Sequence, residues 1–358
     1  MATMNALRLY GPRDLRLAQE PFPAAGPGEA LVRIRSVSVC HSDIHYYQYG
    51  RIGDTVSQEP LILGHEFAGD VVAVGAGVHH VRAGDLVAVE PAVSCGRCRY
   101  CLEGDPNLCL NILFAGTPPL DGALREVAAL GGEFLFPLPA GFTPDDGALL
   151  EPLGVALHAW DLAQARVGES VAIVGCGPIG LLLVQLARLA GAACVLAVEP
   201  IEYRRRLAAR WGAIPIPALG QPYAGDLVAD AEALARAALG DYVWRDHGVD
   251  VAIEVAGTLA AQEEAARLVK RGGTVVLVGI PAEDQVVLSH HIARRKGLTI
   301  KMARRMKHTY PRAIELTRRG MVDLRTLITH HFELAEADAA FRLVAAYGDG
   351  VIKALVHP

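Results

Sequence analysis

The chain has 358 residues, of which 52% are hydrophobic and 20% charged, and its formal net charge at pH 7 is −5. This length favours two domains, and the scattered basic residues argue against a nucleic-acid-binding surface. No window approaches the ~20 consecutive apolar residues of a membrane span. The N-terminus lacks a basic segment followed by an apolar one, so we expect no signal peptide and a cytoplasmic location.

The first part of the chain has the pattern of short strands separated by turns. Strands are expected at residues 30–39, after a Pro-Gly-Glu turn, at 64–77 and at 84–89. This rhythm is typical of an antiparallel, barrel-like β domain.

Two short segments of this region carry metal-binding residue types. Residues 39–46 read V-C-H-S-D-I-H-Y, and residues 64–66 read G-H-E. Cys40, His65 and Glu66 offer a thiolate, an imidazole and a carboxylate, which are the donors that zinc accepts. Three protein ligands leave one coordination position open, as in catalytic zinc sites. The pattern therefore predicts a catalytic zinc.

Two further residues of the first segment suggest proton transfer. Ser42 and His45 place a hydroxyl and an imidazole beside the first zinc ligand. We interpret them as the groups that carry a proton away during oxidation of an alcohol. Each has a structural alternative, since Ser42 could cap a helix that begins at Asp43 and His45 could be a surface histidine.

Four of the seven cysteines lie close together, between residues 93 and 110. Their spacing is Cys-x2-Cys-x2-Cys-x7-Cys, which lets four thiolates close around one tetrahedral zinc with no vacancy. In a cytosolic protein such clustering favours metal over disulfides. We therefore predict a structural zinc held by Cys95, Cys98, Cys101 and Cys109.

A helical stretch, 147–164, precedes a change to alternating strands and helices, and it contains Glu151. A buried strand is expected at 170–174, followed by the loop G-C-G-P-I-G at 175–180 and a helix to residue 190. In this strand–loop–helix context the glycine pattern predicts a dinucleotide site. Gly175 permits the turn, Gly177 admits the pyrophosphate and Gly180 lets helix pack on strand, while Pro178 and Ile179 begin the helix that faces the phosphates.

The next strand, 194–198, ends on an acidic residue, Glu199. A carboxylate there would accept hydrogen bonds from the adenosine ribose and repel a 2′-phosphate, which favours NAD over NADP. Arg204 and Arg205 weaken this preference, because an Arg can accommodate the 2′-phosphate.

Further elements complete a doubly wound sheet. A helix is expected at 224–239, buried strands at 250–255 and 274–278, and another helix at 309–320. Val255 and Gly279 lie at strand ends, where a cofactor sits in such sheets. Residues 285–288 could form an edge strand that pairs with another subunit. Three histidine pairs, at 79–80, 290–291 and 330–331, lack neighbouring ligands and are interpreted as surface or strand-edge residues.

Taken together and in this order, these motifs resemble the zinc-dependent medium-chain dehydrogenases along nearly the whole chain. Within that family, residues 40–46, the Y-G-R-I-G run at 49–53 and Glu151-Pro-Leu make it similar to sorbitol (L-iditol) and related polyol dehydrogenases. The resemblance implies an α/β protein with a GroES-like β-barrel catalytic domain and a Rossmann doubly wound parallel-sheet domain. It predicts a catalytic domain at 1–152 with the zinc lobe at 93–110, an NAD-binding domain at 153–293, and a return to the catalytic domain at 294–358.

The resemblance also implies roles for single residues. Glu151 would be either a direct ligand of the catalytic zinc or bonded to its water, and Tyr46 and Arg305 would contact polyol hydroxyls. Met306 departs from the Tyr that sorbitol enzymes tend to have, which questions sorbitol itself as the substrate. The implied enzyme is a homotetramer or homodimer that uses zinc and NAD.

Three functions follow from these residues. The first is NAD-dependent, reversible oxidation of a secondary hydroxyl of a polyol to a ketose. The second is an L-threonine 3-dehydrogenase or 2,3-butanediol dehydrogenase of the same family. A catalytically silent binding protein is the third, and it would be expected to have lost zinc ligands or glycines that this chain retains.

Overall fold

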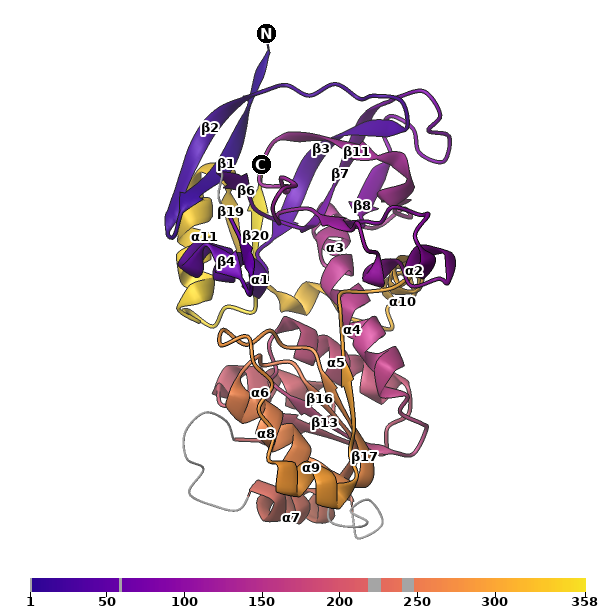
Figure 1. Ribbon diagram of the computed structural model, residues 1–358, viewed down its shortest axis with the longest axis vertical. Helices are drawn as coiled ribbons and strands as arrows, with labels where there is room; N and C mark the ends of the chain where they lie inside the picture. Colours follow the sequence, from indigo (N-terminus) through magenta and orange to yellow (C-terminus); the bar gives the residue numbers. More distant parts are fainter. Residues whose placement is uncertain (1, 58–59, 218–226, 240–247) are drawn as a thin grey trace. The chain divides into compact units, whose positions relative to one another are not determined.

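A computed structural model describes residues 2–57, 60–217, 227–239 and 248–358. The chain divides into two compact units, drawn in Figure 1. The first unit combines Met1–Pro152 with Tyr310–Pro358, and the second is Leu153–Thr309. Within the described residues, no helix combines the length and apolarity needed to cross a membrane.

The first unit is built on a seven-stranded, mostly antiparallel sheet, in the order β12-β8-β7-β3-β20-β19, with β11 pairing β3. The bounds of these strands are β3 Glu29–Ser38, β7 Glu66–Val74, β8 Leu86–Val89, β11 Val127–Gly131, β12 Leu135–Pro137, β19 Ile328–Glu333 and β20 Lys353–His357. A second sheet contains β1 Thr3–Gly11, β2 Asp14–Pro21 and β6 Leu61–Ile62. Short pairs are β4 Arg51–Ile52 with β5 Thr55–Val56, and β9 Ala92–Val93 with β10 Leu113–Phe114. The three strands expected before residue 90 are confirmed as β3, β7 and β8.

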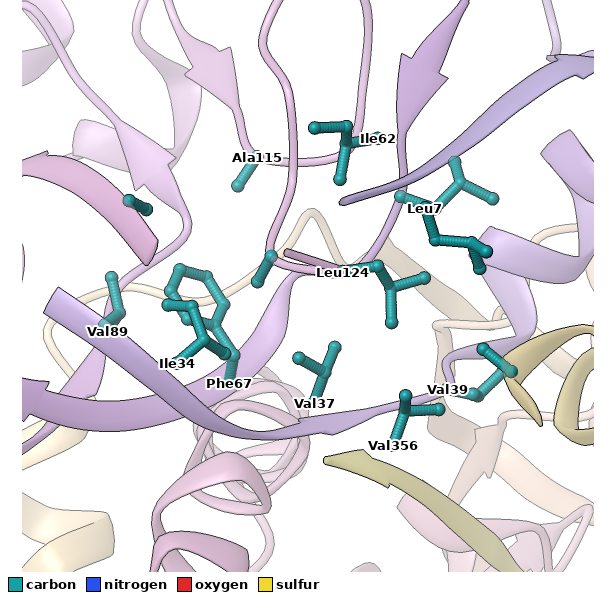
Figure 2. Close-up of a cluster of buried hydrophobic side chains, with 14 of the residues drawn as sticks. Leu7, Ile34, Val37, Val39, Ile62, Phe67, Val89, Ala115, Leu124 and Val356 are labelled. Carbon is teal, nitrogen blue, oxygen red and sulfur yellow. The ribbon is translucent and has the colours of Figure 1, made fainter. Parts of the chain in front are cut away.

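A hydrophobic core fills the space between these sheets (Figure 2). Along β3 buried and more exposed side chains alternate, and Ile34 and Val37 belong to the buried set. Phe67 on β7, Val356 on β20 and Leu7 on β1 pack into the same cluster. The core thereby fixes the end of β3 and the start of β7, which are the two places that lead into the predicted zinc ligands.

Helices of the first unit are α1 His41–Tyr49, α2 Arg99–Leu102, α3 Pro144–Ala148, α10 Tyr310–Arg318 and α11 Ala337–Ala345. Helix α4, Leu150–Ala163, begins in the first unit and continues into the second. The helix expected at 147–164 is thus two helices, interrupted at Leu149, and the one expected at 309–320 is α10.

The second unit contains a six-stranded, wholly parallel sheet in the order β15-β14-β13-β16-β17-β18. In chain order this is 3-2-1-4-5-6, the order of doubly wound dinucleotide-binding sheets. Its strands are β13 Ser170–Val174, β14 Cys194–Val198, β15 Ile214–Ile216, β16 Val249–Glu254, β17 Val269–Leu277 and β18 Thr299–Met302. Its helices are α5 Pro178–Leu189, α6 Glu202–Arg210, α7 Leu227–Leu239, α8 Leu259–Leu268 and α9 His290–Lys296. The helix predicted at 224–239 corresponds to α7, and its residues 224–226 lie outside the described residues.

The edge strand predicted at 285–288 is wrong, because this segment forms no strand. Side chains of α8 take the hydrogen-bonding groups that a neighbouring strand would have used. Gln262 Oε1 accepts from Val287 N at 2.9 Å, and Gln262 Nε2 donates to the Gln285 carbonyl at 3.3 Å. Glu263 Oε2 accepts from Ser289 N at 2.7 Å. These backbone groups are therefore not available for pairing with a strand of a second subunit.

The second unit extends further along the chain than the sequence suggested. The return to the first domain was expected at residue 294, but 294–309 belongs to the second unit. Strand β18 pairs in parallel with β17, from Thr274↔Thr299 to Leu277↔Met302, so it completes the parallel sheet. Because β18 is short and mostly exposed, its sequence does not indicate this pairing.

A charged cluster joins three strands of this sheet. The Asp250 carboxylate on β16 accepts from Ser170 N at 2.8 Å and Ser170 Oγ at 2.7 Å on β13, and from Lys270 Nζ on β17. Burial alone would raise the pKa of Asp250, but the hydrogen bonds from Lys270 and Ser170 lower it below its ordinary value.

We predict that Asp250→Asn lowers the stability of the protein at pH 7 by about 1–3 kcal/mol, because a charged acceptor is lost. The folded-state pKa lies below the unfolded value of about 3.9. The stabilisation is therefore present above that value and is lost as the pH falls through the folded-state pKa. In thermal unfolding at pH 7, Asp250→Asn should have a lower Tm than wild type. This difference in Tm should shrink as the pH is lowered. Asp161→Asn, an exposed carboxylate, is the control, and an equal Tm for Asp250→Asn and wild type at pH 7 would refute the assignment.

Candidate active site

The first candidate site forms where β3 leads into α1. Cys40 is the N-terminal cap of α1, and Asp43 lies in its first turn. The buried Asp43 carboxylate accepts from Cys40 N at 3.2 Å and from Gly64 N at 3.3 Å, and its Oδ1 lies 3.2 Å from His65 Nδ1. One side chain thus ties the two sequence motifs together. The role of Asp43 is not among the predictions from the sequence, although an acidic residue three positions after a helix cap is a recognised signal.

Gly64 allows this close approach. Its φ is +94°, and a Cβ at this position would lie 2.7 Å from a methyl group of Val37. A larger residue would strain the backbone and push the histidine segment away from β3.

The structure brings the three predicted zinc ligands together. One donor atom from each of Cys40, His65 and Glu66 lies within 4.8 Å of the others. Because Asp43 bonds to Nδ1 of His65, Nε2 is the nitrogen left for a metal, which is the common orientation of metal-binding histidines. Burial opposes a charged His65, but the neighbouring Asp43 and Cys40 raise its pKa well above the ordinary value. These three side chains fit a zinc ion.

A lysine completes the charge balance of this site. Lys353, buried on β20, forms an ion pair with Oε2 of Glu66, and its Nζ lies 3.4 Å from the Val39 carbonyl. Burial lowers the pKa of Lys353, but Glu66 and Cys40 more than reverse this and raise it. Lys353 leaves Oε1 of Glu66 for a cation. The sequence contained no local signal for it, because it lies 287 residues from its partner.

Glu151, in the first turn of α4, is buried beside the three ligands but does not belong to the group whose donor atoms converge. Burial raises its pKa to about 8, with Glu66 and Glu90 adding to the rise and His65 opposing it. A carboxylate at this position can hold a proton near neutral pH when no cation is bound.

The residues predicted to transfer protons lie on α1. Ser42 Oγ is 3.3 Å from Nε2 of His65, so it faces the ligand group. The helix begins at His41 with Cys40 as its cap, so Ser42 is not the cap. His45 is half-buried, and burial lowers its pKa. Its ring lies 5.9 Å from that of His41.

The predicted substrate residues are placed differently. Tyr46 has 2% exposure and packs in the core of the first unit. Arg305 belongs to the second unit, with a positive φ of 55°. Next to it, Met306 is buried, and a Cβ on Gly154 would lie 2.4 Å from its sulfur. Met306 is therefore a packing residue against α4.

The four-cysteine lobe gathers around α2 and a short 3-10 helix, Pro106–Leu108. The four cysteine sulfurs lie within 4.8 Å of one another. Cys95 N donates to the Cys109 sulfur at 3.3 Å, and the sulfurs of Cys98 and Cys101 are 3.5 Å apart. Backbone amides of Arg97 and Cys98 lower the pKa of Cys95 to about 6, which favours a thiolate. The donor set fits a structural zinc.

The glycine loop of the second unit has the geometry of a phosphate cradle. Gly175 has a φ of +97°, and a Cβ there would lie 2.8 Å from Ala256. A Cβ on Gly180 would lie 1.9 Å from the Gly175 carbonyl, so this glycine is required for helix–strand packing. A Cβ on Gly177 would meet only the Arg204 guanidinium, at 3.8 Å. The fold itself leaves room at Gly177, and that space fits a pyrophosphate at the start of α5, where Pro178 and Ile179 are the first helical residues.

Glu199 lies beside this loop at the end of β14 and is buried. Its carboxylate accepts from Cys176 N at 2.7 Å and from Ile201 N at 2.9 Å. Arg205 donates to the Glu199 carbonyl at 2.6 Å and to the Pro200 carbonyl. The guanidinium of Arg205 is thus directed to backbone carbonyls.

The carboxyl ends of β16 and β17 meet around Glu254. Its Oε1 accepts from Ala256 N at 2.8 Å and from Gly257 N at 2.6 Å. Val255 continues β16 through a bond to the Val174 carbonyl at 2.9 Å, and a Cβ on Gly279 would lie 2.2 Å from Gly257 N. Glu254, which the sequence analysis did not single out, therefore shapes the two strand ends predicted to face the cofactor.

Comparisons with known proteins agree with both units. Residues 26–140 match the alcohol dehydrogenase GroES-like domain, and residues 178–319 match the zinc-binding dehydrogenase family. Sorbitol dehydrogenase of Bacillus subtilis is 34% identical over 99% of this chain and 97% of that protein. A putative zinc-binding dehydrogenase from Sinorhizobium meliloti, solved bound to NADP, has a TM-score of 0.87 and 33% identity, with full coverage of both chains. The 2R,3R-butanediol dehydrogenase from Bacillus subtilis has a TM-score of 0.85 and 30% identity, covering 99% of each chain.

These matches confirm the expected combination of a GroES-like domain and a Rossmann-like domain. They span nearly the entire chain, and the residues that form the two donor groups and the glycine loop all lie within them. The chain therefore belongs to the zinc-dependent alcohol dehydrogenases of the medium-chain dehydrogenase/reductase family and is an oxidoreductase.

Proposed function

We propose that this enzyme oxidises a secondary hydroxyl of a polyol to a ketone, reversibly and with NAD as the hydride acceptor. The observation that carries the proposal is the converging group of Cys40, His65 and Glu66. The likeness to sorbitol dehydrogenases over the full chain supports a sugar alcohol as the substrate class.

We assign the catalytic zinc to this group and a structural zinc to the four cysteines. A zinc ion bound by three protein ligands supplies Lewis acidity that makes an alcohol proton easier to remove near neutral pH. Asp43 holds the His65 ring in the required orientation, and Lys353 balances the Glu66 charge. We assign Glu151 to a water or substrate hydroxyl at the remaining position, because it lies close by but outside the ligand group.

We assign Ser42 as the first acceptor of the alcohol proton, because its hydroxyl lies 3.3 Å from Nε2 of His65. His45, one helical turn further along α1, would pass that proton to solvent, and its lowered pKa favours the neutral form that accepts a proton. Arg305 stays our proposed contact for a polyol hydroxyl. Tyr46, a residue of α1 that packs in the core, also stays a proposed contact for a polyol hydroxyl.

A second candidate is 2,3-butanediol or L-threonine oxidation. The butanediol dehydrogenase with a TM-score of 0.85 favours it. Both alternatives use the same metal and cofactor groups, so only the substrate separates them. We further propose that the enzyme is cytoplasmic and forms a homodimer or homotetramer. Light scattering on the purified protein would give its molar mass and so decide between the two oligomeric states.

We predict that the enzyme forms NADH with at least one polyol among xylitol, sorbitol and galactitol. The Glu66→Ala variant should lose this activity. The variant should also lose one of the two ions that the two donor groups would hold, because the metal then keeps only two protein ligands. Absorbance at 340 nm and elemental analysis measure these effects, and Glu133→Ala, an exposed carboxylate, is the control. Turnover confined to threonine or butanediol would establish the second candidate, and NADH binding without any turnover would support a silent protein.

We predict that Lys353→Met weakens zinc binding at the catalytic group by roughly 10–100-fold, as loss of a partner of a metal ligand does elsewhere. The methionine fills a similar volume but leaves the Glu66 carboxylate without its cation. Lys353→Arg should restore most of the affinity, because it returns the positive charge. Competition with a chelating dye measures the affinity, and an unchanged value in Lys353→Met would show that the lysine serves packing alone.

We predict that Glu199→Ala raises the ratio of kcat/KM for NADP to that for NAD by roughly tenfold or more, since the carboxylate that repels a 2′-phosphate is removed. Glu202→Ala is a matched control, because Glu202 is an exposed carboxylate on α6 that pairs with Arg206. A ratio that stays constant, or a wild type that already prefers NADP, would contradict the assignment of Glu199.

A further inference from the structure

A third cluster of metal-binding residue types lies in the first unit, apart from the two proposed zinc groups. It consists of Asp145 on α3, His331 on β19 and His357 on β20. His331 has no ligand neighbour nearby in the sequence, because Asp145 and His357 are 186 and 26 residues away along the chain. The fold brings them together.

Strand pairing explains why the two histidines share a face. Glu333 of β19 is opposite His357 of β20, and His331 lies two residues before Glu333, so all three project from the same side of the sheet. The rings of His331 and His357 are stacked, with centroids 5.3 Å apart and planes 14° from parallel. Asp145, in the first turn of α3, closes the third side.

The distances suit a small cation. Asp145 Oδ1 lies 2.9 Å from His357 Nε2, and Oδ2 lies 3.9 Å from His331 Nδ1. One donor atom of each residue lies within 4.8 Å of the others. Zinc–nitrogen and zinc–oxygen bonds of 2.0–2.2 Å place tetrahedral ligands about 3.3–3.5 Å apart. The observed separations bracket this value, so small side-chain rotations would close the site.

An ion pair between Asp145 and His357 accounts for only part of this arrangement. It gives no role to His331, whose imidazole stacks on that of His357 and faces the same carboxylate. Two imidazoles and one carboxylate are a common donor set for zinc. The hydrogen bond to Asp145 raises the pKa of His357, so a metal ion that binds here would displace a proton from that imidazole. The nearby Arg35 guanidinium is paired with Asp70 at 2.6 Å, so its charge is largely balanced.

We propose that Asp145, His331 and His357 form a third metal site, which binds a divalent transition-metal ion such as zinc. The His331 side chain is 53% exposed, so the ion can enter from solvent and water can complete its coordination. An ion bound here would join the C-terminal strands β19 and β20 to α3. Because it binds the folded state, it would raise the Tm of the protein.

The test uses the untagged, zinc-replete enzyme. Equilibrium dialysis against increasing zinc, followed by elemental analysis, counts the ions bound beyond those held by the two proposed zinc groups. We expect one additional ion per chain in wild type, bound roughly tenfold or more weakly in His331→Ala, which loses one of three ligands. His357→Gln should behave in the same way.

His330→Ala is the matched control. His330 precedes His331 on the same strand, but it contacts Thr329 at 2.9 Å and Asp349 at 3.4 Å instead of Asp145. This control should keep the additional ion, and added zinc should raise its Tm as it does for wild type, but not that of His331→Ala. Because His331 is an exposed strand residue, its loss leaves the fold intact. The absence of an additional ion in wild type, or equal binding by His331→Ala and His330→Ala, would overturn the proposal.

Discussion

The first unit depends on one buried carboxylate, that of Asp43. It accepts from the backbone of Cys40 and Gly64 and contacts His65, so it connects the start of α1 to the start of β7. A carboxylate with this little exposure would be costly to bury without such partners. By satisfying it, the fold fixes two ligand positions and the orientation of one imidazole together. The metal site is therefore prepared by protein contacts before any ion binds.

Charge is the second constraint on this site. Glu66 and Glu151 are buried with Glu90 nearby, and Lys353 is the buried cation that faces them. Burial, together with repulsion from Glu66 and Glu90, raises the pKa of Glu151 to about 8, and Lys353 forms an ion pair with Glu66. A divalent cation beside these buried carboxylates would reduce the repulsion between them. Electrostatics and ligand geometry therefore both favour a metal ion at this site.

Sequence reasoning succeeded where chemistry is local. The four cysteines lie within 15 residues, the glycine loop is continuous with its strand and helix, and His65 adjoins Glu66. It failed where a partner comes from a distant segment. Lys353 and the group around His331 have no periodicity or spacing that indicates them, because strand pairing between segments far apart in the chain creates their contacts.

Its errors in secondary structure have the same origin. Residues 285–288 contain two valines, which are common in strands, yet Gln262 and Glu263 supply the hydrogen bonds that another strand would have made. Strand β18 has mostly exposed side chains and was assigned to the wrong unit, although its backbone pairs fully with β17. In both cases the secondary structure depends on which residues supply the backbone hydrogen bonds. The sequence of one segment alone does not identify those residues.

The position of β20 has a consequence for biosynthesis. This strand pairs with β3 across more than 300 residues and carries Lys353, whereas the residues of the second unit are contiguous. A nascent chain can therefore complete the parallel sheet while β3 still has an unpaired edge and Glu66 lacks its cation. Because β20 follows the second unit in the chain, the first sheet and the electrostatic environment of the catalytic group can be completed only after the second unit has been synthesised.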